Sequence, residues 1–288
     1  MVHGTVSREL NVKTARQLAN ALGRDSIVQM FPELGPLRIK VKSTANEFSD
    51  TDIYSMTATT RGYACILSYE SFENRPDLVL EASQTDALNY ANVFTQMGFT
   101  CDVHTSLTNE ETVNALERVR DMKALNDVGC AVFVISSHGS TGDSFLTSDM
   151  KQIYTERILN LFKDTECPQL RNKPKLFIFD FCRGYYVENG SHFHVTSPIR
   201  IQEPLQDMIC LYSSSNGFSS YSFTKDGSAF GKALCQTLAQ HSHDMELHEL
   251  YRELIMEYRK VSLAVPQLRN IGFSKKYYFN PVPSTSMY

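Results

Sequence analysis

The sequence lacks the features of a membrane or secreted protein. Its longest apolar runs, such as residues 130–135 (CAVFVI), are far too short to span a bilayer, and its N-terminus has no charged-then-apolar signal layout. It also has no C-x-x-C pair. Of its seven cysteines, five lie in apolar segments typical of reduced core thiols, namely Cys65, Cys101, Cys130, Cys210 and Cys235. We therefore expect a cytoplasmic protein without membrane contact.

Signals of nucleic-acid, nucleotide and metal binding are missing as well. The net charge is -4 and no face is rich in Lys and Arg, which argues against a nucleic-acid partner. No Gly-rich phosphate loop is present, so we expect no nucleotide cofactor. The H-x-H pairs His192/His194 and His241/His243 have no Cys or carboxylate companions at ligand spacing. We therefore expect no metal and no other cofactor.

Residues 1–50 differ in character from the rest of the chain. They are polar and mixed, with one predicted helix at 8–22, and a segment of this size rarely folds unaided. We interpret them as an N-terminal prosegment or arm. From Arg61 onward, apolar runs alternate with helical periodicity, which predicts an α/β fold with a mainly parallel sheet and helices on both faces. The predicted strands are 63–68, 99–103, 130–136, 175–180, 209–214 and 276–280, and the predicted helices are 83–97, one capped by Thr108 and Glu111, 151–163, 228–241 and 246–260.

Two reactive side chains follow predicted strands. His138 comes after the strand 130–136, and Cys182 comes after the strand 175–180. In such sheets the ligand site lies at the carboxyl ends of the strands. A thiol becomes a useful nucleophile when an imidazole takes its proton, and a glycine beside the histidine lets a backbone N–H approach an oxyanion. Either residue alone is better interpreted as an inert core thiol or a turn histidine, but together they indicate a site.

The sequence around these residues resembles the caspases. That family has a Q-A-C-[RQG]-G signature with its histidine about 50 residues upstream. This chain has D-F-C-R-G at 180–184 and S-H-G at 137–139. Further segments are similar to the first core strand (54–69), the start of the small subunit (209–230) and the final strand (275–281). The resemblance runs from about residue 53 to the C-terminus.

The resemblance implies a fold and a set of roles. The fold is a six-stranded, mostly parallel sheet sandwiched between helices. It divides into a large-subunit-like part (51–190), an intersubunit linker (191–206) and a small-subunit-like part (207–288). His138 would be the base and Cys182 the nucleophile, and the N–H groups of Gly139 and Cys182 would form the oxyanion hole. Ser220 and Tyr221 would line the substrate groove, and the final strand would pair two chains into a dimer.

Three positions depart from the family pattern. Caspases bind the carboxylate of a P1 aspartate with two arginines and a glutamine. By alignment, Ala82 and Ser222 stand in place of the arginines, and Asp180 stands in place of the glutamine. Removing the partner of a desolvated charge costs about 2–5 kcal/mol. Cleavage after aspartate is therefore predicted to be impaired or lost.

Asp180 permits a second interpretation. Paracaspases and metacaspases, relatives that cut after Arg or Lys, also carry an aspartate two residues before the nucleophile. An acidic pocket of Asp180 and Glu81 would favour a guanidinium. The alternative is a pocket that is no longer used.

The linker bears on both interpretations. It contains no aspartate from residue 185 to residue 206, and Arg200 is its only basic residue. The chain is therefore expected to escape cleavage after aspartate in this region. The leading hypothesis is a decoy that regulates an active caspase in apoptosis, as a heterodimer with that caspase or as a homodimer. The alternative is an active cysteine endopeptidase acting on peptide or protein substrates with altered, Arg or Lys, P1 specificity.

Overall fold

The computed structural model describes residues 39–45, 48, 50–140, 142–183, 204–215, 223–224 and 227–282, with backbone alone at 223–224. The chain from Ile39 onward forms one compact unit. Most of the predicted prosegment (1–50) and linker (191–206) lies outside the described residues.

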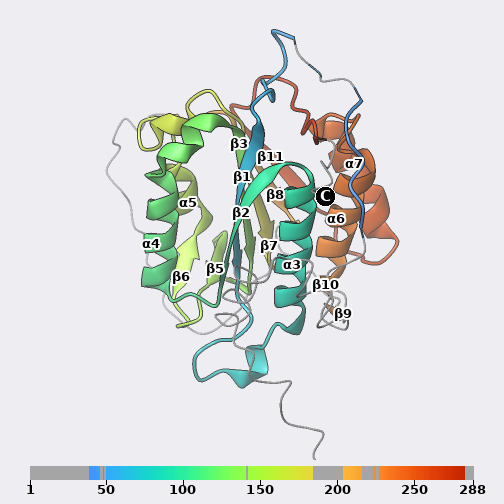
Figure 1. Cartoon of the computed structure of the whole chain (residues 1–288). Helices are drawn as coiled ribbons and strands as arrows, with labels where there is room; N and C mark the ends of the chain where they lie inside the picture. The colour runs from blue at the N-terminus through green and yellow to red at the C-terminus, as the bar shows by residue number, and fades with distance from the viewer. Residues whose placement is uncertain are drawn as a thin grey trace, which may run out of the picture. The chain divides into compact units, whose positions relative to one another are not determined.

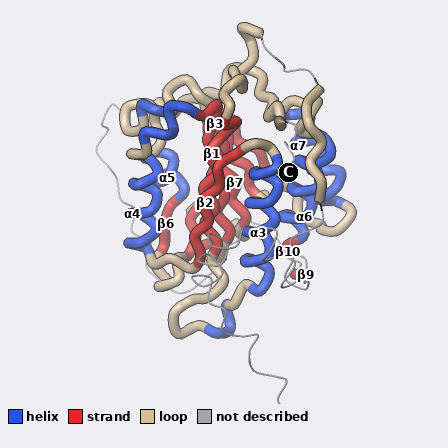
Figure 2. Tube along the Cα trace, viewed as in Figure 1, coloured by secondary structure: helices blue, strands red, loops and turns tan. Residues whose placement is uncertain are grey.

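A six-stranded sheet forms the centre of this unit (Figures 1 and 2). Five strands are parallel, and the last is antiparallel to its neighbour. This agrees with the predicted six-stranded, mostly parallel sheet. In spatial order the strands are β11 (Gln267–Ile271), β8 (Met208–Tyr212), β7 (Lys175–Asp180), β3 (Val128–Ser136), β1 (Thr60–Ser68) and β2 (Phe99–Thr105).

Helices cover both faces of the sheet, as predicted (Figure 1). On one side lie α3 (Glu81–Gln96), α6 (Ala229–His241) and α7 (Leu247–Arg259), and on the other α4 (Asn109–Arg120) and α5 (Thr155–Leu161). Strand β3 is buried along its whole length, because alternate side chains enter different cores. Val132 and Val134 pack with the first group of helices, and Phe133 and Ile135 with the second.

Two small sheets and three short 3-10 helices complete the described structure. The sheets consist of β4 (Gly139–Ser140), β5 (Ser144–Leu146) and β6 (Gln152–Tyr154), and of β9 (Phe223–Thr224) and β10 (Gly227–Ser228). The 3-10 helices are η2 (Pro76–Leu78), η3 (Lys123–Asp127) and η4 (Pro168–Leu170).

The predicted capping box at the start of α4 is present. The Glu111 backbone N–H donates to the Thr108 hydroxyl at 3.3 Å, and the Thr108 N–H donates to the Glu111 carboxylate at 2.9 Å. Each bond satisfies a donor that the first helical turn leaves unpaired. The helix predicted at 151–163 begins later, at Thr155, because residues 152–154 form β6.

The predicted final strand at 276–280 is wrong. These residues lie outside the named strands, and Lys276 makes only an isolated bridge to Ile53. Tyr277 and Phe279 are buried in the core, so their alternation reflects packing and not a sheet ladder. The sixth strand is β11, which pairs with β8 and ends the sheet.

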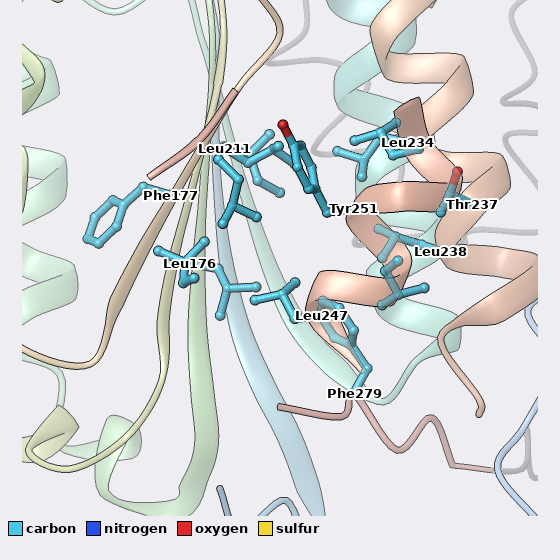
Figure 3. A pocket seen from close by; sticks show the side chains of 14 residues that line it. Leu176, Phe177, Leu211, Leu234, Thr237, Leu238, Leu247, Tyr251 and Phe279 are labelled. Carbon is cyan, nitrogen blue, oxygen red and sulfur yellow. The ribbon is translucent and has the colours of Figure 1, made fainter. Parts of the chain in front are cut away.

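A small apolar cavity of about 30 Å³ lies between the sheet and helices α6 and α7 (Figure 3). Leucines from both layers line it, together with Phe279, Thr237 and Tyr251. The Tyr251 hydroxyl donates to the carbonyl oxygen of Pro266 at 2.9 Å. No charged side chain is among the described residues that line this cavity.

Candidate active site

The sheet register brings the two predicted reactive residues to one edge. Strands β3 and β7 are parallel neighbours, and Ser136 pairs with Asp180 at their carboxyl ends. The segments that follow therefore leave the sheet side by side. His138 and Cys182 both line one cavity of about 80 Å³ at this edge.

Gly139 lies directly against the backbone of Cys182. A Cβ atom on Gly139 would overlap the carbonyl oxygen of Cys182, so no other residue fits without a backbone shift. The structure thus brings together the two residues whose N–H groups were predicted to bind an oxyanion.

His138 is held by a partner that the sequence does not reveal. Its Nε2 atom lies 2.7 Å from the carbonyl oxygen of Leu78, and its ring packs against Phe72 with centroids 5.1 Å apart. A carbonyl oxygen can only accept, so Nε2 carries the proton and Nδ1 of the neutral ring is left as a proton acceptor. Burial lowers the pKa of His138, which keeps the imidazole neutral at neutral pH.

Arg183, the residue after Cys182, is anchored by three side-chain contacts. It forms an ion pair with Asp143 at 2.6 Å and lies 4.0 Å from the centre of the Tyr212 ring on β8. Its Nη1 also donates to the side chain of Gln267, the first residue of the edge strand β11. The backbone after Cys182 is therefore tied to the edge of the sheet.

The cavity beside Cys182 and His138 is lined by two aspartates. Asp180 lines it as the last residue of β7, and Asp86 lines it from α3. Both are almost completely buried. No Arg or Lys is among its lining residues within the part of the chain that the structure describes.

Ser228, the N-cap of α6, holds both carboxylates. Its backbone N–H donates to the two carboxylate oxygens of Asp86 at 3.0 and 2.9 Å, and its hydroxyl donates to Asp180 at 3.1 Å. Burial and the charge of Asp180 raise the pKa of Asp86 to about 8. Burial raises the pKa of Asp180 to about 6, against the opposing effect of its serine hydrogen bonds. The pair therefore retains a proton near neutral pH.

The remaining residues that were predicted to line the pocket lie elsewhere or outside the described residues. Ala82 is buried in α3 but does not line the cavity, whereas its neighbour Ser83 does. Glu81 is exposed and is not a lining residue, so the suggestion that it contributes to an acidic pocket is wrong, and Asp86 takes that place. Ser220, Tyr221 and Ser222 lie outside the described residues.

Two further features are absent from the described residues. No group of three or more His, Cys, Asp or Glu side chains in this part of the chain is arranged to hold a metal ion. Likewise, none of the helices that the structure describes has the length and apolar character needed to cross a bilayer.

Comparison with known proteins agrees with this geometry. The Caspase domain family matches residues 61–278. The chain is 28% identical to caspase-2 of Gallus gallus, and the match covers 68% of this chain and 51% of that protein. It is 27% identical to caspase-3 of Bos taurus, and the match covers 77% of this chain and 82% of that protein. It spans about half the length of chicken caspase-2 and of Caspase Dronc from Drosophila melanogaster.

Solved structures show the same fold. The crystal structure of the Drosophila initiator caspase Dronc matches with a TM-score of 0.69 at 20% identity, covering 84% of this chain and 94% of that one. The crystal structure of caspase-1 from Spodoptera frugiperda matches with a TM-score of 0.69 at 21% identity, covering 84% of this chain and 99% of that one. The fold is that of one class of cysteine peptidases. Within that class, the chain belongs to the caspase family.

Proposed function

We propose that this chain is a caspase homologue with little or no cleavage after aspartate, and that it regulates an active caspase by pairing with it in apoptosis. The observation that carries the proposal is the acidic cavity. Asp86 and Asp180 line the space beside Cys182 and His138, and no Arg or Lys among the described residues lines it. A substrate carboxylate there would meet repulsion where it needs a cationic partner.

The edge strand β11 supports the pairing half of the proposal. It ends the six-stranded sheet and is only five residues long. An open strand edge can pair with the same edge of a near relative about a two-fold axis. Through Gln267, this edge contacts Arg183, so a partner bound there would act on the segment that carries Cys182.

The test is a titration of the chain into a closely related active caspase. We expect the wild-type chain and Cys182→Ala to raise the partner's rate of peptide cleavage equally. The reason is that this chain supplies a strand edge for pairing and does not itself cleave the peptide. An unrelated protein at equal concentration controls for crowding. If neither form associates with the caspase or changes its rate, the regulator proposal is wrong.

A second candidate function is a cysteine endopeptidase that cleaves after Arg or Lys. The specific observation in its favour is that Asp180 lines the same cavity as Cys182 and His138. A carboxylate is the natural partner of a guanidinium. Digestion of a peptide library with Asp, Glu, Arg and Lys at P1 tests it. Cleavage after Arg or Lys that disappears in Cys182→Ala would support this function over the regulator.

A further inference from the structure

The stretch from Arg259 to Lys276 carries charge of one sign. It comprises the end of α7, the loop 261–266, strand β11 and the residues that follow, and it contains no Asp or Glu, in a chain whose net charge is -4. Its cations are all exposed, namely Arg259, Lys260, Arg269, Lys275 and Lys276. Lys260 pairs with Glu257 at 2.6 Å, and none of the others forms an ion pair within the described residues. Most of the positive charge of this stretch is therefore not offset.

Three apolar side chains of the same stretch are left in water. The exposed fraction is 58% for Val261, 103% for Leu263 and 39% for Val265. They lie on the loop that runs from α7 into β11, and the Ser215 hydroxyl donates to the carbonyl oxygen of Val265 at 3.0 Å. Exposed apolar side chains that gather beside an open strand edge are typical of a protein contact.

Strand β11 is too short to hold a partner by itself. Its five residues pair with β8 on one side, and no described strand pairs with the other side. A stable protein contact buries about 1,200–2,000 Å² in total, which is far more than a strand of this length can cover. A partner bound to this edge must therefore also cover the neighbouring loop 261–266.

A second copy of this chain does not suit this surface. When two copies pair about a two-fold axis through the middle of β11, Arg269 of one lies opposite Arg269 of the other. Each copy also brings the other cations of the stretch and no carboxylate from it. Like charges directly opposite each other on paired strands are destabilising, whereas opposite charges are stabilising. The charge of the surface therefore favours an acidic partner.

We propose that residues 259–276 form a docking surface for a different chain with an acidic strand edge, which places a carboxylate opposite Arg269 and apolar side chains against Val261 and Leu263. The proposal rests on the proposed regulatory function and adds the chemistry of the partner. Complementary charge speeds the encounter and fixes the register of pairing. Burial of the apolar side chains supplies attraction that does not depend on direction.

A mixture of two forms of the protein tests the charge selection. Arg269→Glu supplies an acidic edge, because the introduced carboxylate faces Arg269 of the wild type when the two pair. Sedimentation measures the association of each form alone and of the mixture, and thermal unfolding checks that the variant is folded. We expect the mixed complex to be at least about tenfold tighter than either self-complex. It should weaken as salt is raised from about 0.1 M to about 1 M, because the Debye length falls from about 10 Å to about 3 Å.

The matched control for this mixture is Lys123→Glu, which reverses an exposed charge on η3 outside the stretch. Mixed with the wild type, it should associate no more tightly than the wild type alone. A third variant, Arg269→Gln, separates charge selection from a structural defect. It should self-associate more tightly than the wild type and bind an active caspase more weakly, whereas a structural defect would weaken both.

Titration into the active caspase separates this proposal from the regulator proposal. We expect Arg269→Glu and Leu263→Ser to bind the caspase at least about tenfold more weakly than the wild type. Lys123→Glu and Leu88→Ser, which alters a leucine of α3 that is 43% exposed, should bind as the wild type does.

Three outcomes would decide the matter differently. Equal binding of the wild type and Arg269→Glu to the caspase, or a mixed complex no tighter than the self-complexes, would overturn the docking proposal and leave the regulator proposal standing. A tight mixed complex without any binding to the caspase would support the charge selection and contradict the regulator proposal. Binding of the wild type to phosphatidylserine vesicles that Arg269→Glu abolishes would assign the stretch to a membrane surface and overturn the docking proposal.

Discussion

The Nε2 atom of His138 lies 2.7 Å from the carbonyl oxygen of Leu78, the last residue of η2. The bond fixes the tautomer, and burial lowers the pKa of the ring. A neutral imidazole with Nδ1 unprotonated is therefore present at neutral pH, in the same cavity as the Cys182 thiol. One cavity therefore contains an imidazole that can accept a proton and a thiol that can release one.

Alkylation of Cys182 tests this arrangement. We expect His138→Ala to slow its reaction with iodoacetamide at pH 7 by about tenfold, because the thiol loses the base that takes its proton. Mass spectrometry resolves Cys182 from the buried cysteines, and His104→Ala, which removes a histidine on β2, is the control. Equal rates in the wild type and His138→Ala would show that the two side chains do not cooperate.

Peptides with aspartate at P1 should be hydrolysed negligibly. With Asp86 and Asp180 beside the nucleophile, the substrate carboxylate enters without a cationic partner. Each lost partner of a desolvated charge costs about 2–5 kcal/mol, which is roughly 30-fold to several thousand-fold in kcat/KM. A fluorogenic peptide assay measures this. Turnover that Cys182→Ala abolishes would contradict the prediction.

The expressed chain should stay intact between residues 184 and 207. That segment offers no aspartate before Asp207, so neither the chain itself nor an aspartate-specific partner has a bond to cut there. Intact mass after purification is the measurement. Separation into two fragments would refute the prediction, and a cut after Arg200 would favour the peptidase with a basic P1 preference.

Stability should fall as the pH rises through the range in which Asp86 titrates. Burial and the charge of Asp180 raise its folded-state pKa, so the folded chain keeps a proton that the unfolded chain releases above about pH 4. The wild type should lose stability from about pH 4 to about pH 8, by up to about 1.4 kcal/mol per pH unit from Asp86, and Asp180, whose pKa burial also raises, adds to the loss up to about pH 6. Urea unfolding at several pH values measures this. The free energy of unfolding should fall less steeply with pH in Asp86→Asn than in the wild type, and as steeply in Asp121→Asn as in the wild type.

Self-association through β11 should be weak. Arg269 is the exposed middle residue of this strand. When the strand pairs with its own copy about a two-fold axis through its centre, the two Arg269 side chains lie opposite each other, and like charges there are destabilising. Sedimentation should show stronger dimerisation of Arg269→Ala than of the wild type, with the exposed Lys123→Ala as control. A wild-type dimer that Arg269→Ala weakens would contradict this.

The sequence predicted most of the fold because its apolar runs coincide with the buried strands. Strands β3 and β7 are apolar runs buried on both faces, and parallel pairing follows from the helices between them. Strand β11 (QLRNI) was missed because it is an edge strand with polar residues and has no such run. Tyr277 and Phe279 alternate as strand residues would, but their side chains pack in the core while their backbone forms no β-ladder.

For the site, the sequence predicted the residues that follow strand ends, but not the contacts made across the fold. His138 and Cys182 were found from their positions after β3 and β7. Asp86 was missed because only tertiary packing brings α3 to Ser228, 142 residues away along the chain. The carbonyl of Leu78 is a backbone group, which no residue pattern can indicate.

The stacking of Arg183 on Tyr212 gives the molecule a built-in spectroscopic reporter. The Nε–H of Arg183 donates to the Asp143 carboxylate at 2.8 Å and its guanidinium lies 4.0 Å from the ring centre, so the hydrogen bond and the aromatic ring current together should set this resonance apart from those of exposed arginines. The same side chain contacts Gln267 at the edge of the sheet and follows the nucleophile in sequence. One nitrogen-labelled arginine signal can therefore record, in solution and without turnover, whether that edge is occupied.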